Sequence, residues 1–304
     1  MINGHFETVI PSAFFKMDGV DYTRERLELS DGDFLDIDWL KRESNQCMVI
    51  THGLEGGTDR FYVKRTATYF HNQGWDIAAW NCRSCSGEMN RLPRFYHHGD
   101  TIDLDEVVSK VLSSGYEKVV LFGYSMGGSM SLKYLGEASC DKRILGATVF
   151  SVPCNLRDSA VQLTLKGNRF YERRFLKKLK DKIVIKGKVH PELKVDQLEA
   201  MTTFDEFHDC YTAPLHGFKD KEEFFQLATC DRYFDGISVP VLIVNALNDP
   251  MLGPKCYPKE FASTNPNFYL ETPKLGGHCG FTVSGETFSY MEYRARWFID
   301  RYLL

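Results

Sequence analysis

A G-x-S-x-G motif between a strand pattern and a helix pattern is the feature that most constrains this chain. The run 119–122 is short, apolar and rich in β-branched residues, which indicates a buried strand. The motif itself, 123–127, follows at once, with Gly128 behind it. Three apolar residues then recur at helical spacing, Met130, Leu132 and Leu135. The order of strand, tight turn and helix, with Ser125 at the apex, predicts a nucleophile elbow.

The glycines have a physical role in this turn. A serine held in a strained turn needs neighbours without a Cβ, because strand and helix must approach closely. The first peptide N–H of the helix, at Met126, then points to where an oxyanion would form. The alternative is a glycine-rich turn that only joins a strand to a helix. It is disfavoured because the strand and the helix patterns are both present.

Length and composition limit the classes of protein to consider. The chain has 304 residues, which is ordinary for an α/β core that carries an insertion. Hydrophobic residues make up 43%, and no apolar run approaches the roughly 18 residues of a spanning helix. The net charge of −4 and the lack of a sustained basic and aromatic pattern give no indication of a nucleic-acid partner.

The cysteines and the N-terminus bear on the cellular compartment. The nine cysteines follow no framework spacing and are odd in number, which suits reduced thiols. The first 15 residues show no basic segment followed by an apolar one, so no signal peptide is expected. A cytoplasmic protein without an integral membrane segment is therefore predicted, and its oligomeric state stays open.

Strand and helix patterns alternate along most of the chain. Residues 1–23 show little periodicity and are expected to wrap the surface. Two alternating runs around Ser30-Asp31-Gly32-Asp33 predict a β-hairpin with a D-G turn. Strands are expected at 26–29, 34–39, 47–50, 75–80, 119–122, 147–152, 239–246 and 268–270, and helices at 61–73, 100–114 and 288–303. In the last helix a buried stripe is expected of Met291, Ala295, Phe298, Ile299 and Tyr302.

This alternation predicts an α/β fold with a mostly parallel sheet, helices on both faces and an N-terminal antiparallel hairpin. The pattern breaks at 153–235, which is helical and charged and has strand character only at 182–185. We expect this segment to be an inserted helical cap, or lid, over a core formed by 1–152 and 236–304. Its basic run, 169–180, fits a solvated amphipathic helix, and less readily a lid that touches anionic lipid or substrate.

Ser125 needs a base within hydrogen-bond reach, and that base needs a carboxylate to fix its tautomer. In the α/β-hydrolase arrangement these residues follow in the order serine, acid, histidine. Asp249 comes directly after one predicted strand, and His278 lies in a glycine-flanked loop after the last one. Rival residues lie in the cap segment or precede a strand: His190, His208, His216, Asp231 and Asp235. A Ser125–Asp249–His278 triad is therefore predicted.

The loop 52–57, HGLEGG, is the second oxyanion candidate. The backbone N–H of Leu54 is expected to join that of Met126, and one such donor typically lowers the barrier by about 3 kcal/mol. His52 precedes the serine, so we expect it to shape the loop instead of acting as the base.

Two other patterns are explained better as structural residues than as a redox pair or a metal site. Cys82 and Cys85 form a C-x-x-C pair, but a loop follows where a redox motif would need a helix, and no second pair supplies a zinc site. His97 and His98 are adjacent, and neighbouring residues rarely converge on one ion. A hydrogen-bonding role is expected for them, with no metal and no cofactor.

Five motifs together resemble the YheT-type subfamily of α/β-hydrolases, a group of serine esterases with lipid-active eukaryotic relatives. They are HGLEGG at 52–57, NCRSCSGEMNRLPRFYHHGDT at 81–101, GYSMGG at 123–128, NALNDPML at 245–252 and GGHCGF at 276–281. The cap segment FDEFHDCYTAPLHGF at 204–218 fits the same resemblance. His98 departs from it, since the family pattern would have serine there.

The resemblance implies the triad Ser125, Asp249 and His278 and hydrolysis of carboxylic esters, of short-chain acyl groups or acylglycerols. The expected partner is a small ester substrate, with lipid-derived esters included. A thioesterase, acyltransferase or lipase on the same triad is the first alternative. A non-catalytic binding protein with this fold is the second, and the intact triad argues against it.

Overall fold

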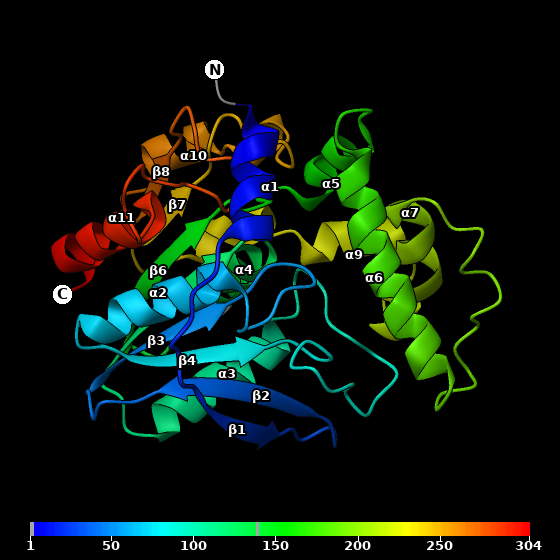
Figure 1. Cartoon of the computed structure of the whole chain (residues 1–304), viewed down its shortest axis with the longest axis horizontal. Coiled ribbons are helices and arrows are strands. Elements are labelled where there is room, and N and C mark those ends of the chain that lie inside the picture. The colour runs from blue at the N-terminus through cyan, green and yellow to red at the C-terminus, as the bar shows by residue number, and fades with distance from the viewer. Residues whose placement is uncertain (1–2, 138–139) are drawn as a thin grey trace.

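The structure, a computed structural model, describes residues 3–137 and 140–304. It is built on one eight-stranded sheet with the order β1-β2-β4-β3-β5-β6-β7-β8 (Figure 1). The strands are β1 (Thr23–Glu28), β2 (Phe34–Leu40), β3 (Gln46–Thr51), β4 (Asp76–Asn81), β5 (Lys118–Tyr124), β6 (Ile144–Phe150), β7 (Val241–Val244) and β8 (Phe268–Glu271). The two pairings that involve β2 are antiparallel, and the remaining pairings are parallel.

The predicted fold class is confirmed. The first two strands form the expected hairpin, in which Leu27 lies opposite Leu35. The strands from β3 onward alternate with helices, so their carboxyl ends lie at one edge of the sheet. The loops expected to carry chemistry follow β3, β5, β7 and β8 and therefore meet at that edge.

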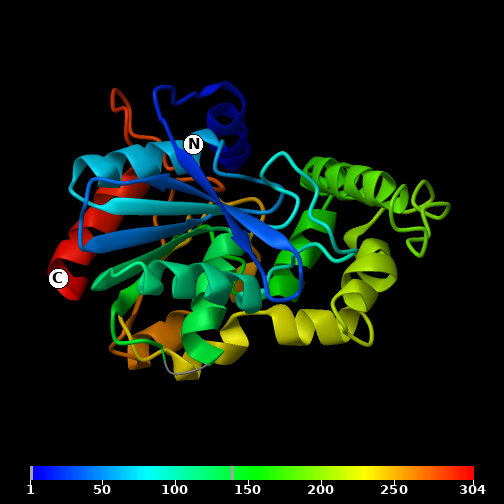
Figure 2. The same cartoon turned by 90° about the horizontal axis from the view of Figure 1, so that it is seen from below.

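Helices cover both faces of the sheet (Figure 2). On one face α2 (Phe61–Asn72) and α11 (Tyr290–Phe298) pack through Phe70 and Phe298. On the other face α3 (Thr101–Ser113), α4 (Met126–Glu137) and α10 (Lys259–Thr264) lie against the second core cluster. The chain ends in a π-helical turn, η4 (Ile299–Leu303). Apolar side chains of the sheet are buried on both faces, as is typical of a parallel sheet.

The segment between β6 and β7 is entirely helical where it has regular structure. Its helices are α5 (Leu156–Thr164), α6 (Arg169–Gly187), α7 (Phe204–Phe207), the π-helical turn η1 (His208–Thr212), α8 (Ala213–Leu215), α9 (Lys221–Ala228) and the 3₁₀ turn η2 (Asp231–Gly236). Most of them lie beyond the carboxyl ends of the strands, beside the sheet (Figure 1), whereas the last turn, η2, packs against α4. A further 3₁₀ turn, η3 (Pro254–Cys256), follows β7. Within the described residues, no helix combines the length and the apolar character needed to cross a bilayer.

The structure differs from the sequence patterns in three places. Residues 4–14 form a helix, α1 (Gly4–Phe14), which Asn3 caps by accepting the His5 N–H. The run 182–185 lies inside α6. The charged residues at helical spacing around it outweigh the strand propensity of its three β-branched residues, Ile183, Val184 and Ile185. In the C-terminal helix Tyr302 is partly exposed, whereas the other four residues of the expected stripe are buried.

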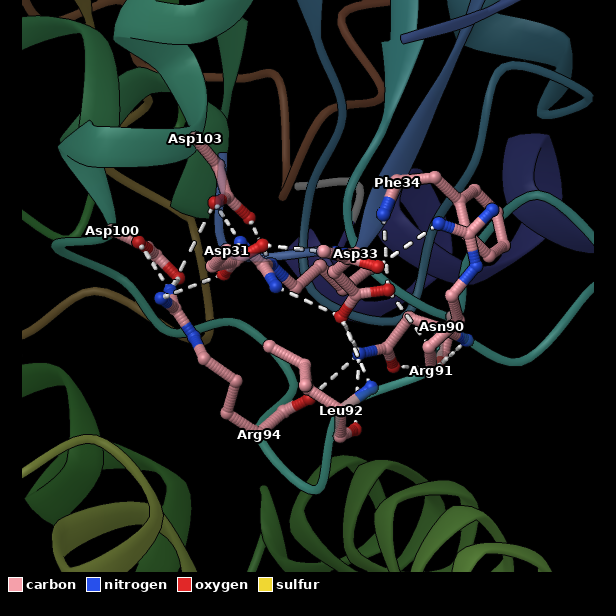
Figure 3. Close-up of polar contacts among 12 residues, drawn as sticks. Asp31, Asp33, Phe34, Asn90, Arg91, Leu92, Arg94, Asp100 and Asp103 are labelled. Carbon is pink, nitrogen blue, oxygen red and sulfur yellow. Dashed lines mark hydrogen bonds and ion pairs between the residues drawn. The ribbon is translucent and has the colours of Figure 1, made fainter. Parts of the chain in front are cut away.

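A buried polar network fixes the hairpin turn to the loop after β4. Arg83 donates to Asp33 and to both oxygens of Asp103, each at 2.8 Å, and it pairs with Asp31 at 2.8 Å. Figure 3 shows the carboxylates of Asp31 and Asp33, from the hairpin turn, and of Asp103, from α3, pointing toward one another. Burial is the main cause that raises the pKa of Asp103 to about 6, and the negative charge of the neighbouring Asp100 adds to it. The guanidinium of Arg83 therefore offsets a concentration of buried negative charge.

Replacing Arg83 should destabilise the fold strongly. Arg83→Met leaves Asp33 and Asp103 buried without their cation, and we expect a loss of about 3–5 kcal/mol in the free energy of unfolding. Arg91→Met is the control, because Arg91 pairs with Glu28 at the surface and should cost at most about 1 kcal/mol. Urea denaturation followed by circular dichroism measures both. Equal midpoints for the two variants would contradict a structural role for the network.

Candidate active site

Ser125 lies in a turn that requires glycine two residues before it and two residues after it, at Gly123 and Gly127. It has a left-handed backbone with φ of 49°, directly between β5 and α4. A Cβ on Gly123 would lie 2.6 Å from the Gly127 carbonyl oxygen, and one on Gly127 would lie 2.3 Å from the carbonyl oxygen of Thr51. Strand, helix and the loop after β3 therefore meet with no room for side chains. The N–H of Ser125 donates to the carbonyl of Phe150 at 2.8 Å, which holds the turn on the sheet.

The three residues predicted to act together lie in one hydrogen-bonded chain. The His278 Nε2 atom is 2.9 Å from the Ser125 hydroxyl oxygen, and its Nδ1 atom is 2.8 Å from Asp249 Oδ2. Asp249 is buried and also accepts the N–H of Met251 at 2.9 Å. An ionised carboxylate only accepts hydrogen bonds, so Nδ1 carries the proton and Nε2 faces the serine as the acceptor. The arrangement can take a proton from the Ser125 hydroxyl.

Helix α1 supports the loops that carry Asp249 and His278, and sequence reasoning missed this role. Thr8 Oγ1 accepts the backbone N–H of His278 at 2.8 Å and donates to the carbonyl of Gly4 at 2.7 Å. The carboxylate of Glu7 accepts the N–H of Gly276 at 3.2 Å and the side-chain amide of Asn248. The only local signal for α1 was Asn3 as a helix N-cap. Its partners lie more than 240 residues away in the chain, where no periodicity reveals them.

The loop 52–57 lies directly beside the serine. A Cβ on Gly53 would be 3.4 Å from the Ser125 Cβ, and the N–H of Gly56 closes a tight turn onto the Gly53 carbonyl at 2.9 Å. Across residues 3–137 and 140–304, the backbone N–H groups of Leu54 and Met126 find no acceptor within the protein. Two unengaged donors next to a serine hydroxyl are what an oxyanion hole requires.

His52 is buried, and both of its ring nitrogens are hydrogen-bonded to backbone groups. Its Nε2 atom accepts the N–H of Cys82 at 3.1 Å, so its Nδ1 atom carries the proton and donates to the Gly53 carbonyl at 2.7 Å. Burial lowers the pKa of His52 from its ordinary 6.5 to about 4. The imidazole is therefore a neutral link that joins the loop after β3 to the loop after β4.

An apolar pocket opens onto Ser125 and His278. Its walls come from the loop after β4 and from the helices between β6 and β7. The apolar lining includes Leu54, Leu163, Phe175, Leu179, Ile183, Phe204, Phe207, Phe224 and Phe225. Histidines 97, 98, 208 and 216 also line it, and burial lowers the pKa of His98 to about 4 and that of His208 to about 3. The pocket is thus apolar over most of its surface, with the charged Lys182 in its lining, as is typical of a small-molecule site.

Residues that could hold a metal are already engaged with other groups. His97, Asp100 and His216 bring ligand atoms within 4.8 Å of one another, while His98 is not part of this group. The His97 Nδ1 atom accepts the N–H of Gly99 at 3.1 Å, which puts the ring proton on Nε2. Arg94 donates to both oxygens of Asp100, at 2.8 and 3.0 Å. The hydrogen bonding therefore opposes a cation at this place.

Cys82 and Cys85 are free thiols, and within the described residues neither belongs to a cluster of three possible metal ligands. Cys82 is buried, and burial raises the pKa of both thiols. The ammonium of Lys182 lies 3.4 Å from the Cys85 sulfur. These contacts fit structural thiols.

Comparison with known proteins identifies the class. Residues 46–284 match the model of the alpha/beta hydrolase fold family, and the chain belongs to that family. A protein of Escherichia coli K12 named as a candidate esterase, YheT, is 29% identical over 92% of this chain and 84% of its own length. The resemblance expected from the motifs is thereby confirmed.

Two further likenesses are informative. The phospholipase ABHD3 of Mus musculus is 27% identical over 86% of this chain and 67% of its own length. Among solved structures, an esterase of Pyrococcus furiosus superposes with a TM-score of 0.63. It covers 95% of this chain and 97% of its own, and its 16% identity shows the fold alone.

The neutral state of His52 predicts a pH dependence of stability. Below pH 6.5 the unfolded chain takes up a proton that the folded chain accepts only near pH 4. Stability from this residue is therefore complete above pH 6.5 and falls as the pH drops toward 4. In His52→Gln, whose amide can still donate and accept, the loss of unfolding free energy between pH 7 and pH 5 should be smaller by about 2 kcal/mol. Denaturation at the two pH values measures it, and parallel losses in both proteins would contradict it.

Proposed function

We propose that the protein is a serine hydrolase that cleaves carboxylic esters through an acyl-enzyme intermediate. The observation that carries this proposal is the continuous chain Asp249–His278–Ser125, with the acceptor nitrogen of the imidazole 2.9 Å from the hydroxyl. The free N–H groups of Leu54 and Met126 beside that hydroxyl support the same chemistry. The names of the relatives, which include an esterase and a phospholipase, agree with ester substrates.

The proposed reaction has two halves. The Ser125 oxygen attacks the ester carbonyl while His278 takes the hydroxyl proton, and Asp249 stabilises the imidazolium that forms. The N–H groups of Leu54 and Met126 donate to the tetrahedral oxygen. His278 then protonates the leaving alkoxide. Water, deprotonated by His278, attacks the acyl-enzyme carbonyl, and the carboxylic acid leaves as Ser125 regains its proton.

The apolar pocket favours an acyl group over a polar leaving group as its occupant. We propose that residues 153–235 act as a cap that supplies most of this pocket, through α5, α6, α7 and α9. Each methylene buried there would contribute about 0.8 kcal/mol, or roughly fourfold in kcat/KM. A pocket of this character favours substrates with several apolar carbons, which keeps an acylglycerol lipase as the second candidate function.

Loss of the nucleophile should abolish turnover. We expect Ser125→Ala to lower kcat on p-nitrophenyl butyrate by about 10⁴-fold or more, because the triad acts as a unit. Ser284→Ala, at an exposed loop position, should match the wild-type protein. A fluorophosphonate probe should label the wild-type chain and not the Ser125 variant. Equal turnover and equal labelling in both proteins would exclude the assignment.

The pocket should set the preferred acyl length. In the wild-type protein kcat/KM should rise from acetyl toward octanoyl p-nitrophenyl esters. Leu179→Trp, which narrows the pocket, should lower kcat/KM for the octanoyl ester about tenfold and leave the acetyl ester within about twofold. Ile185→Trp is the control, because Ile185 lies on the exposed side of the same helix. A parallel loss on all esters in Leu179→Trp would contradict this location of the acyl chain.

A further inference from the structure

Glu55 is a buried carboxylate one residue after the Leu54 N–H. Its Oε1 atom accepts the hydroxyl of Tyr96 at 2.6 Å and the ammonium of Lys182 at 2.8 Å. Tyr96 lies in the loop after β4, and Lys182 lies on α6. The carboxylate therefore joins the loop beside Ser125 to two other parts of the chain.

The backbone of Glu55 is also fixed from several sides. It has a left-handed conformation, with φ of 54°, which residues with a Cβ rarely adopt. Its N–H donates to the Tyr96 hydroxyl at 2.9 Å. Its carbonyl accepts Arg60 Nη2 at 3.1 Å and Lys178 Nζ at 3.2 Å. An unfavourable backbone conformation persists where surrounding contacts over-determine it, and here they do so next to the proposed oxyanion donor.

Helix α6 supplies two of these contacts from one of its faces. Lys178 and Lys182 are four residues apart, so they lie one above the other on the helix. Lys182 has only 14% of its side chain exposed and Glu55 only 4%, so the pair is largely shielded from solvent. Buried ion pairs add little net stability, but their geometry is specific. The contact is therefore better suited to fixing a conformation than to stabilising the fold.

We propose that Glu55, Lys182 and Tyr96 are positioning residues that aim the Leu54 N–H into the oxyanion hole, with α6 as the element that holds them. This inference rests on the proposed function. Helix α6, which lines the proposed acyl pocket, would then also hold the loop whose N–H stabilises the transition state. When α6 is displaced, Glu55 loses both lysine contacts, and the loop can relax from its left-handed turn.

The test compares ground-state and transition-state binding in matched variants. Lys182→Met and Glu55→Gln should lower kcat on p-nitrophenyl butyrate about 10- to 100-fold and change KM by less than about threefold. Their affinity for butylboronic acid, which forms a tetrahedral adduct at a serine, should fall by the same factor. Lys182→Arg should recover most of the loss. The double variant should lose no more than about threefold beyond the worse single variant, because the two residues act as a unit.

Lys177→Met is the control, since Lys177 lies on the same helix, is 76% exposed and pairs with Asp181. It should match the wild-type protein in all measurements. Wild-type kcat and boronate affinity in folded Lys182→Met would overturn the inference. A change confined to KM would overturn it too, because that would assign Lys182 to substrate binding. Failure of the proposed function is a different result, namely a wild-type protein that neither hydrolyses esters nor reacts with the fluorophosphonate.

Discussion

The close approach of three backbone segments around Ser125 is the constraint on which the site depends. A left-handed serine costs about 1–3 kcal/mol, and it persists because β5, α4 and the loop after β3 enclose it. Gly123 and Gly127 permit that contact, and a Cβ at either position would overlap backbone atoms. The side chain of Ser125 is consequently held at the apex of the turn, and the other groups of the site are arranged around it.

These other groups come from parts of the chain that are distant in sequence. His278 lies 153 residues after Ser125, and its backbone is held by Thr8, 270 residues before it. No local element could stabilise such a site alone. The sheet brings the loops to one edge, and α1 then joins two of them, because Glu7 accepts from both Asn248 and Gly276 while Thr8 holds His278. The geometry of the site is therefore a property of the whole fold.

The residues that sequence analysis could predict are those whose position follows from the sheet. Asp249 and His278 were recognisable because each follows a strand, and strand ends of a parallel sheet converge. Glu55 and α1 were not, because their roles arise from contacts with Lys182 and with the loop at 276–280 that no spacing encodes. The strand character at 182–185 misled for the opposite reason, because local β-branched propensity yielded to a long helix packed on the core.

In the proposed mechanism helix α6 has two roles, since it lines the pocket and contacts the loop beside Ser125. Phe175, Leu179 and Lys182 line the apolar pocket, while Lys178 and Lys182 contact Glu55 in the loop that carries Leu54. The pair Phe175 and Leu179 is offset by three residues from the two lysines on one rigid helix, so neither pair can move without the other. Under the proposed function, a substrate that fills the pocket would hold α6 against the core and would thereby favour the conformation of the loop at 52–57. Binding energy from the acyl chain, which lies away from the reacting carbonyl, would then appear in kcat as well as in KM.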